Sequence, residues 1–154
     1  QHFARLENVF QCSNEFFFSH YASNKHVESG YRTKWENYDI QLRKRMPEFP
    51  FSNIWMAQQL HSMIPAGSIA HSAILSSLSS WDYFPLPKDV RSSANVGGFG
   101  IDGCTSTLIG ASLSSHELCF CITGDLAFFY DMNSLGCREI GPNLRILLIN
   151  NGLA

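Results

Sequence analysis

Two short apolar segments, 118–123 and 144–149, constrain the fold of this chain more than any other feature. A helical pattern from about 125 to 139 separates them, and polar residues follow each segment at once. Strands that are apolar along their whole length are buried on both faces, and strands joined by a helix run parallel. The pattern therefore predicts an α/β fold, in which a parallel sheet carries helices on both faces.

The rest of the chain is consistent with this architecture. A third strand is expected at 68–75, and helices are expected at 32–46, from Ser52 or Asn53 to Ile64, and at 105–115. The stretch 76–95 has no regular pattern, and a loop of that length in a compact domain is usually functional. We expect 1–31 to be a linker or the tail of an upstream domain. Residues 32–154 should form one partial domain, truncated at its C-terminal side.

Composition excludes several classes of function. Hydrophobic residues make up 45% of the chain and charged residues 16%, which is typical of a globular protein with a buried core. The net charge of −2 indicates neither a nucleic-acid partner nor an anionic membrane partner. No apolar run approaches the length of a membrane span, and the first residues do not resemble a signal peptide. Five cysteines without framework spacing are typical of a reduced protein, so we expect a cytoplasmic location.

Polar residues at two strand ends predict a binding site. Gly124-Asp125 follows one predicted strand, and Asn150-Asn151 follows the next. The helix that begins near Asp125 directs free backbone N–H groups toward the same edge, which suits a phosphate. A carboxylate and an amide oxygen beside a phosphate suit Mg²⁺. The alternatives are that Asp125 is an ordinary helix N-cap and that Asn-Asn-Gly is an ordinary turn.

Taken together, two motifs resemble the signature of thiamine-diphosphate-dependent enzymes. Gly124-Asp125 and Asn151, twenty-six positions after Asp125, are similar to the Gly-Asp-Gly and Asn-Asn pair of that family. The segment 95–103, Asn-Val-Gly-Gly-Phe-Gly-Ile-Asp-Gly, resembles the loop on the pyrimidine side of the cofactor. With Gly-Asp-Leu at 124–126 and Tyr-Asp-Met-Asn at 130–133, the chain is most similar to the menaquinone-pathway 2-succinyl-5-enolpyruvyl-6-hydroxy-3-cyclohexene-1-carboxylate synthase type. The resemblance covers about residues 50–152.

The resemblance implies a role for each motif residue in a cofactor-binding domain for thiamine diphosphate and Mg²⁺. Asp125 and Asn151 would be the side-chain ligands of Mg²⁺, and the backbone carbonyl of Leu153 would complete the metal site. Ile101 would be the apolar wedge that bends the cofactor and brings its two rings together. The implied cofactor-binding residues are Asn95, Gly100, Ile101, Gly124, Asp125, Leu126 and Ala127.

The resemblance also implies the chemistry of the parent protein. It would be a 2-oxoacid decarboxylase or carboligase, a transferase or lyase acting on a small-molecule 2-oxoacid. The family's catalytic glutamate lies on a pyrimidine-binding domain of the same chain or of a partner chain, in a homo-oligomer such as a dimer or tetramer. We therefore expect no catalytic residue in this chain and no turnover by this part alone.

Departures from the family pattern keep other functions open. Leu126 replaces the second Gly of the motif, as in the menaquinone-pathway type, and the spacer before Asn151 is one residue shorter than usual. Val96 stands where the menaquinone-pathway type has a substrate-binding Arg, and 76–81 contains no second Arg. These departures favour the alternative of a non-catalytic relative or interaction domain. A nucleotide-binding domain ranks last, because the chain has neither a Walker motif nor a dinucleotide fingerprint.

Overall fold

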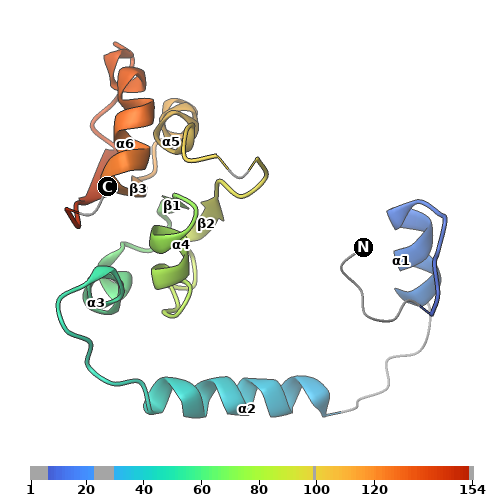
Figure 1. Cartoon of the computed structure of the whole chain (residues 1–154). Coiled ribbons are helices and arrows are strands. Elements are labelled where there is room, and N and C mark those ends of the chain that lie inside the picture. Colours follow the sequence, from blue (N-terminus) through green and yellow to red (C-terminus); the bar gives the residue numbers. More distant parts are fainter. Residues whose placement is uncertain (1–6, 23–29, 99, 153–154) are drawn as a thin grey trace. The chain divides into compact units, whose positions relative to one another are not determined.

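The computed structural model describes residues 7–22, 30–98 and 100–152, and the chain divides into two compact units, 1–46 and 47–154. The first unit contains helix α1 (Asn14–Ala22) and helix α2 (Tyr31–Lys44) (Figure 1). Neither helix buries a residue. Helix α2 matches its predicted position to within two residues. Helix α1 falls in the stretch 1–31, for which we expected a linker or tail and no helix. The division of the chain at residue 31 remains a prediction.

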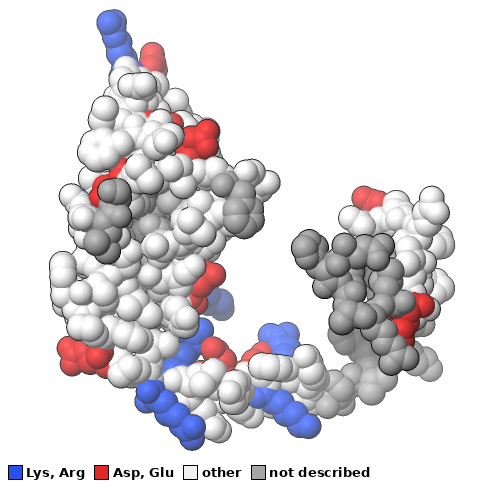
Figure 2. Space-filling view, viewed as in Figure 1, with Lys and Arg blue, Asp and Glu red and all other residues white. Residues whose placement is uncertain are grey.

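Helix α2 carries both charged and aromatic side chains at its surface. Lys and Arg side chains gather along it, whereas most of the visible face of the second unit is uncharged (Figure 2). Arg32 pairs with Glu36 at 2.6 Å and Arg43 with Asp39 at 2.7 Å, both one helical turn apart. Such exposed pairs contribute little to stability.

The second unit is built on a four-stranded, fully parallel sheet in the order β2-β1-β3-β4. The strands are β1 (Ile69–Ser72), β2 (Arg91–Ala94), β3 (Cys119–Gly124) and β4 (Leu144–Ile149). The predicted parallel α/β fold is therefore confirmed, and the predicted strand at 144–149 has the observed bounds.

Helices cover both faces of this sheet. On one face, Cys104 and Leu108 of α5 (Cys104–Leu113) and Ala127 of α6 (Asp125–Asp131) pack with Cys119 and Cys121 of β3 in the main hydrophobic cluster. Ile122 points to the opposite face, since side chains alternate along a strand. There it shares a cavity lining with residues of α4 (Ser76–Trp81). Helix α3 (Asn53–Leu60) packs on α4 (Figure 1). Short 3₁₀ turns, η1 (His61–Met63) and η2 (Met132–Gly136), extend α3 and α6.

The stretch 76–95, expected to be irregular, contains both α4 and β2. Helix α4 has the sequence SSLSSW and β2 has the sequence RSSA, so neither carries a recognisable apolar period. Strand β2 lies at the edge of the sheet, pairs only with β1, and is almost wholly exposed. Its backbone pairing, which the amino-acid pattern does not reveal, makes it a strand.

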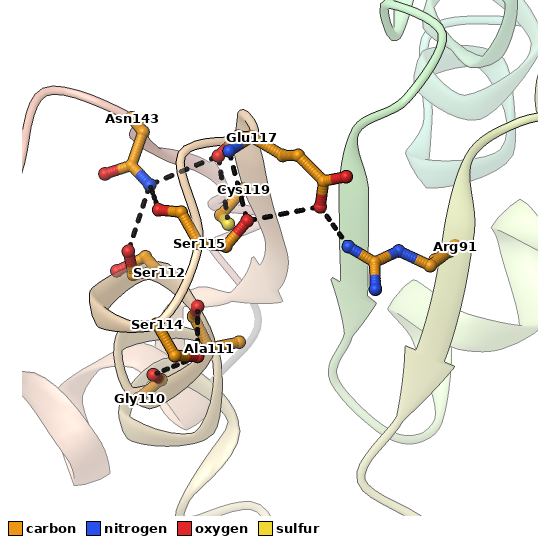
Figure 3. Close-up of polar contacts among 9 residues, drawn as sticks. All are labelled: Arg91, Gly110, Ala111, Ser112, Ser114, Ser115, Glu117, Cys119 and Asn143. Atoms are coloured by element: carbon orange, nitrogen blue, oxygen red, sulfur yellow. Dashed lines mark hydrogen bonds and ion pairs between the residues drawn. The ribbon is translucent and has the colours of Figure 1, made fainter.

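At the amino ends of the strands, polar side chains connect the loops through hydrogen bonds and an ion pair (Figure 3). The Nδ2 of Asn143, just before β4, donates to the carbonyls of Ser112, Ser115 and Glu117 at 3.1, 2.9 and 3.1 Å. Glu117 also forms an ion pair with Arg91, the first residue of β2. This edge of the sheet is therefore cross-linked by side chains from distant parts of the chain.

Among the described residues, no helix has both the length and the apolar character that a membrane crossing requires.

Candidate functional site

A cavity of about 210 Å³ opens at the carboxyl ends of the strands. The chain runs from β1 outward to β2, returns past β1 to β3, and continues outward to β4, so the strand order reverses between β1 and β3. In open parallel sheets, ligands bind at such a reversal point, outside the carboxyl ends of the strands. The residues that line the cavity follow β1, β3 and β4, so it lies where the topology favours a ligand.

Five separate segments contribute to the wall of this cavity. Four of them lie at or after the carboxyl end of a strand, including Ile101 in the loop between β2 and α5, whereas Asn53 is the first residue of α3. The lining consists of Asn53, Ala73, Ile74, Leu75, Ser76, Ser77, Ile101, Gly124, Asp125, Leu126, Ala127, Ile149 and Asn151.

Most of the residues predicted from the sequence meet at this cavity. Ile101, the run 124–127 and Asn151 all line it, although they come from three separate segments. Asn95 and Gly100 do not line it. The Nδ2 of Asn95 instead donates to the carbonyl of Asp102 at 2.8 Å. Leu153 lies outside the described residues. Cofactor-binding and metal-binding roles for all of these residues remain predictions.

The pairing of β3 with β4 brings the two polar strand ends together. Gly124 is in register with Ile149, so Asp125 and Asn150 leave the sheet side by side. Asp125 is half-buried, and its Oδ1 accepts a hydrogen bond from the N–H of Leu126 at 2.8 Å. The Oδ1 of Asn150 accepts from the N–H of Gly152 at 2.9 Å, and Asn151 lines the cavity. Asp125 and Asn151 therefore border the same space.

This donor set fits Mg²⁺ held together with a phosphate. Magnesium takes one or two protein oxygen ligands and completes its shell with phosphate oxygens and water. Asp125 and Asn151 would supply the protein oxygens. The described residues contain no cluster of three His, Cys, Asp or Glu side chains that could hold a metal by itself. A metal at this edge would therefore depend on its phosphate partner.

Leu75 introduces backbone strain at the cavity wall. It has a φ of 67° and is the one described non-glycine residue with a positive φ. Leucine rarely adopts this conformation, which costs on the order of 1–3 kcal/mol. Its side chain is 60% exposed, so burial does not compensate for the strain. Strain of this kind is concentrated at functional sites.

The lining residues that were not predicted from the sequence are Asn53, the segment 73–77 and Ile149. The rule that ligands bind at strand ends applies equally to the first predicted strand. That strand was predicted to continue to residue 75, but it ends at Ser72. Residues 73–75, expected inside a strand, thus belong to the loop that forms the wall.

Two buried titratable side chains lie in the core of the second unit, His71 in β1 and Cys104 in α5. His71 in β1 is 4% exposed, and burial lowers the pKa of its imidazole. Its Nδ1 lies 2.8 Å from the Oγ of Ser93, and its buried Nε2 has no hydrogen-bond partner among the described residues. The hydrogen bond with Cys121, together with burial, raises the pKa of the Cys104 thiol. These groups are core components, and none of them lines the cavity.

Comparisons with known proteins agree with this geometry. No protein-family model matches the chain. It is 41% identical to the 2-succinyl-5-enolpyruvyl-6-hydroxy-3-cyclohexene-1-carboxylate synthase of Bacteroides fragilis over 122 residues, covering 79% of this chain and 22% of the relative. The synthase of the same name from Christiangramia forsetii is 41% identical over 106 residues, covering 69% of this chain and 18% of the relative. That of Desulfotalea psychrophila is 34% identical over 135 residues, covering 88% and 24%.

The chain thus spans roughly a quarter or less of the length of the curated relatives it matches. These matches cover 69–88% of the chain. The chain is therefore homologous to a segment of the 2-succinyl-5-enolpyruvyl-6-hydroxy-3-cyclohexene-1-carboxylate synthases, which confirms its resemblance to the menaquinone-pathway type of thiamine-diphosphate-dependent enzyme.

Proposed function

We propose that this chain binds the diphosphate end of thiamine diphosphate through Mg²⁺, at the cavity between the carboxyl ends of β1, β3 and β4. The observation that carries the proposal is the meeting of Ile101, the run 124–127 and Asn151 at one cavity. The resemblance assigns these residues to the same cofactor, and the cavity lies at the reversal of strand order, where open parallel sheets bind ligands.

The residues have distinct tasks in this proposal. Asp125 and Asn151 hold Mg²⁺, and Leu153 contributes its backbone carbonyl. The backbone from Gly124 to Ala127 faces the diphosphate oxygens. Ile101, half-buried against the main hydrophobic cluster, offers a firm apolar surface on which the cofactor bends. When bound, thiamine diphosphate supplies an electron sink for reactions of 2-oxoacids.

The activity of the whole protein is a wider proposal. Relatives of 31–41% identity carry the name of one synthase, so we assign the parent protein to the 2-oxoacid decarboxylases and carboligases. A pyrimidine-binding domain, from the same or a partner chain of a homo-oligomer, would supply the catalytic glutamate. The competing proposal is a non-catalytic relative, which Val96 in place of a substrate-binding Arg favours. A protein that binds the cofactor but releases no CO₂ from any of a panel of 2-oxoacids would support that alternative.

Calorimetry of the full-length protein with thiamine diphosphate tests the proposed site. We expect binding in Mg²⁺ and none in excess chelator. Asp125→Ala should weaken binding by roughly 100-fold, because the metal loses its carboxylate ligand. The matched control, Asp89→Ala, removes an exposed carboxylate outside the cavity and should bind like the wild type. Binding that is independent of Mg²⁺ and unchanged in Asp125→Ala would refute the proposed site.

A further inference from the structure

The loop that carries Ile101 leads directly into helix α5. Ile101 lies three residues before Cys104, the first residue of the helix. The N-cap of α5 is Gly103, with a φ of 80°, and glycine has no side chain to bond the free N–H groups of the first turn. The start of α5 therefore needs a cap from elsewhere in the fold.

Asp131 supplies that cap. Its Oδ2 accepts a hydrogen bond from the backbone N–H of Ser106, in the first turn of α5, at 2.6 Å. A carboxylate at this position also interacts favourably with the positive end of the helix dipole. Asp131 is the last residue of α6, and α6 begins at Asp125. One side chain thus connects the helix that starts at the proposed metal ligand with the helix that follows the proposed wedge.

Further hydrogen bonds hold both Asp131 and the loop that precedes α5. The backbone carbonyl of Asp131 accepts from the Oγ of Ser134 at 2.7 Å, which fixes the end of α6. On the other side of the loop, the Nδ2 of Asn95 bonds the carbonyl of Asp102 at 2.8 Å. The loop around Ile101 is therefore attached on one side to the end of β2 and on the other, through α5, to the end of α6.

We propose that Asp131 is a positioning residue, which sets the place of Ile101 relative to Asp125 by capping α5. The proposal rests on the proposed function, in which Ile101 contacts the bend of the cofactor and Asp125 contacts the metal at its diphosphate end. A cap that only stabilised the fold would affect unfolding but not the contribution of Ile101 to binding. The two roles therefore predict different behaviour when residue 131 and residue 101 are changed together.

Two measurements on the full-length protein test this role. The first is hydrogen exchange of the segment 100–107 without cofactor. Asp131→Ala should speed exchange throughout this segment, including 100–103, whereas Asp131→Asn, which keeps an acceptor oxygen, should restore protection. Asp89→Ala is the matched control, because it removes an exposed carboxylate that takes no part in this contact, and its exchange should match that of the wild type. Faster exchange confined to 104–107, or no change, would overturn the proposal.

The second measurement is the affinity for thiamine diphosphate with Mg²⁺. Asp131→Ala should weaken it by about tenfold, because a misplaced wedge no longer matches the bent cofactor. In an Ile101→Ala background the same change should have little further effect. An equal loss in both backgrounds, or an equal loss in Asp131→Asn, would overturn the positioning role. If the wild type binds no thiamine diphosphate, the proposed function fails, and the exchange measurement alone decides whether Asp131 fixes the loop.

Discussion

The polar residues that flank β3 and β4 at the two edges of the parallel sheet differ in the reach of their side-chain hydrogen bonds. At the amino edge, Asn143 bonds backbone carbonyls 26 to 31 positions away, and Arg91 of β2 pairs with Glu117, just before β3, past the strand β1 that lies between them (Figure 3). At the carboxyl edge, Asp125 bonds the N–H of the next residue, and Asn150 bonds a residue two positions away. The amino edge connects distant loops, whereas the carboxyl edge leaves a cavity between its loops.

The difference in hydrogen bonding indicates that the two edges of the sheet have different tasks. The amino edge fixes the strands in register and requires no ligand to satisfy its polar groups. The carboxyl edge holds a strained Leu75 and a pair of oxygen-bearing side chains around open space. Strain and unfilled space lower stability, and they persist where the rest of the fold enforces them. We infer that the amino edge stabilises the domain while the carboxyl edge binds the ligand.

The largest expected effect on stability comes from Asn143 at the amino edge. Asn143→Ala removes the amide that bonds three carbonyls and should lower the free energy of unfolding by about 2 kcal/mol. Cofactor affinity of the folded protein should not change. Urea denaturation and calorimetry measure the two quantities. Asn133→Ala, at an exposed position of η2, is the control and should leave stability within about 0.5 kcal/mol of wild type. If Asn143→Ala lowers cofactor affinity but not stability, the assignment of stability to the amino edge and of binding to the carboxyl edge is wrong.

The part of the carboxyl edge that is formed by apolar strands could be predicted from the sequence. Strands β3 and β4 are strongly apolar, so their ends, with Asp125 and Asn151, could be predicted to meet. The short polar strand β2 and the serine-rich helix α4 left no such signal. The wall formed by 73–77 was not predicted, because the first strand was expected to continue to residue 75 and instead ends at Ser72. Likewise, the cap that Asp131 provides joins residues 25 positions apart, which no local pattern reveals.

A smaller effect, of opposite sign, is expected from Leu75 at the carboxyl edge. Leu75→Gly should raise the free energy of unfolding by roughly 1 kcal/mol or less, because glycine adopts a positive φ without strain. Leu75→Ala is the matched variant, since it shortens the same side chain but retains the strain. Thermal unfolding of the two variants gives the comparison. If Leu75→Gly is no more stable than Leu75→Ala, strain is not stored at this edge.

The smallest effect concerns pH and His71, which lies in β1 between the two edges. Burial lowers its pKa in the folded protein, so the unfolded chain, with a pKa near 6.5, binds the proton more readily. The contribution of His71 to the free energy of unfolding is therefore fully present above pH 6.5. It is lost as the pH falls through the pKa of His71 in the folded protein. Denaturation at several pH values should show a steeper acid loss in the wild type than in His71→Gln. Equal slopes would show that His71 does not titrate on unfolding. His116→Gln, at an exposed position, is the control.

In the proposed site, Asp125 and Asn151 hold one cation together with a diphosphate. A calorimetric double-mutant cycle in the full-length protein tests it, with thiamine diphosphate titrated in saturating Mg²⁺ against wild type, Asp125→Ala, Asn151→Ala and the double variant. Two ligands of one ion are coupled, so the double variant should bind little more weakly than Asp125→Ala alone. Losses that add in full, or an Asn151→Ala variant that binds like the wild type, would contradict a shared metal site.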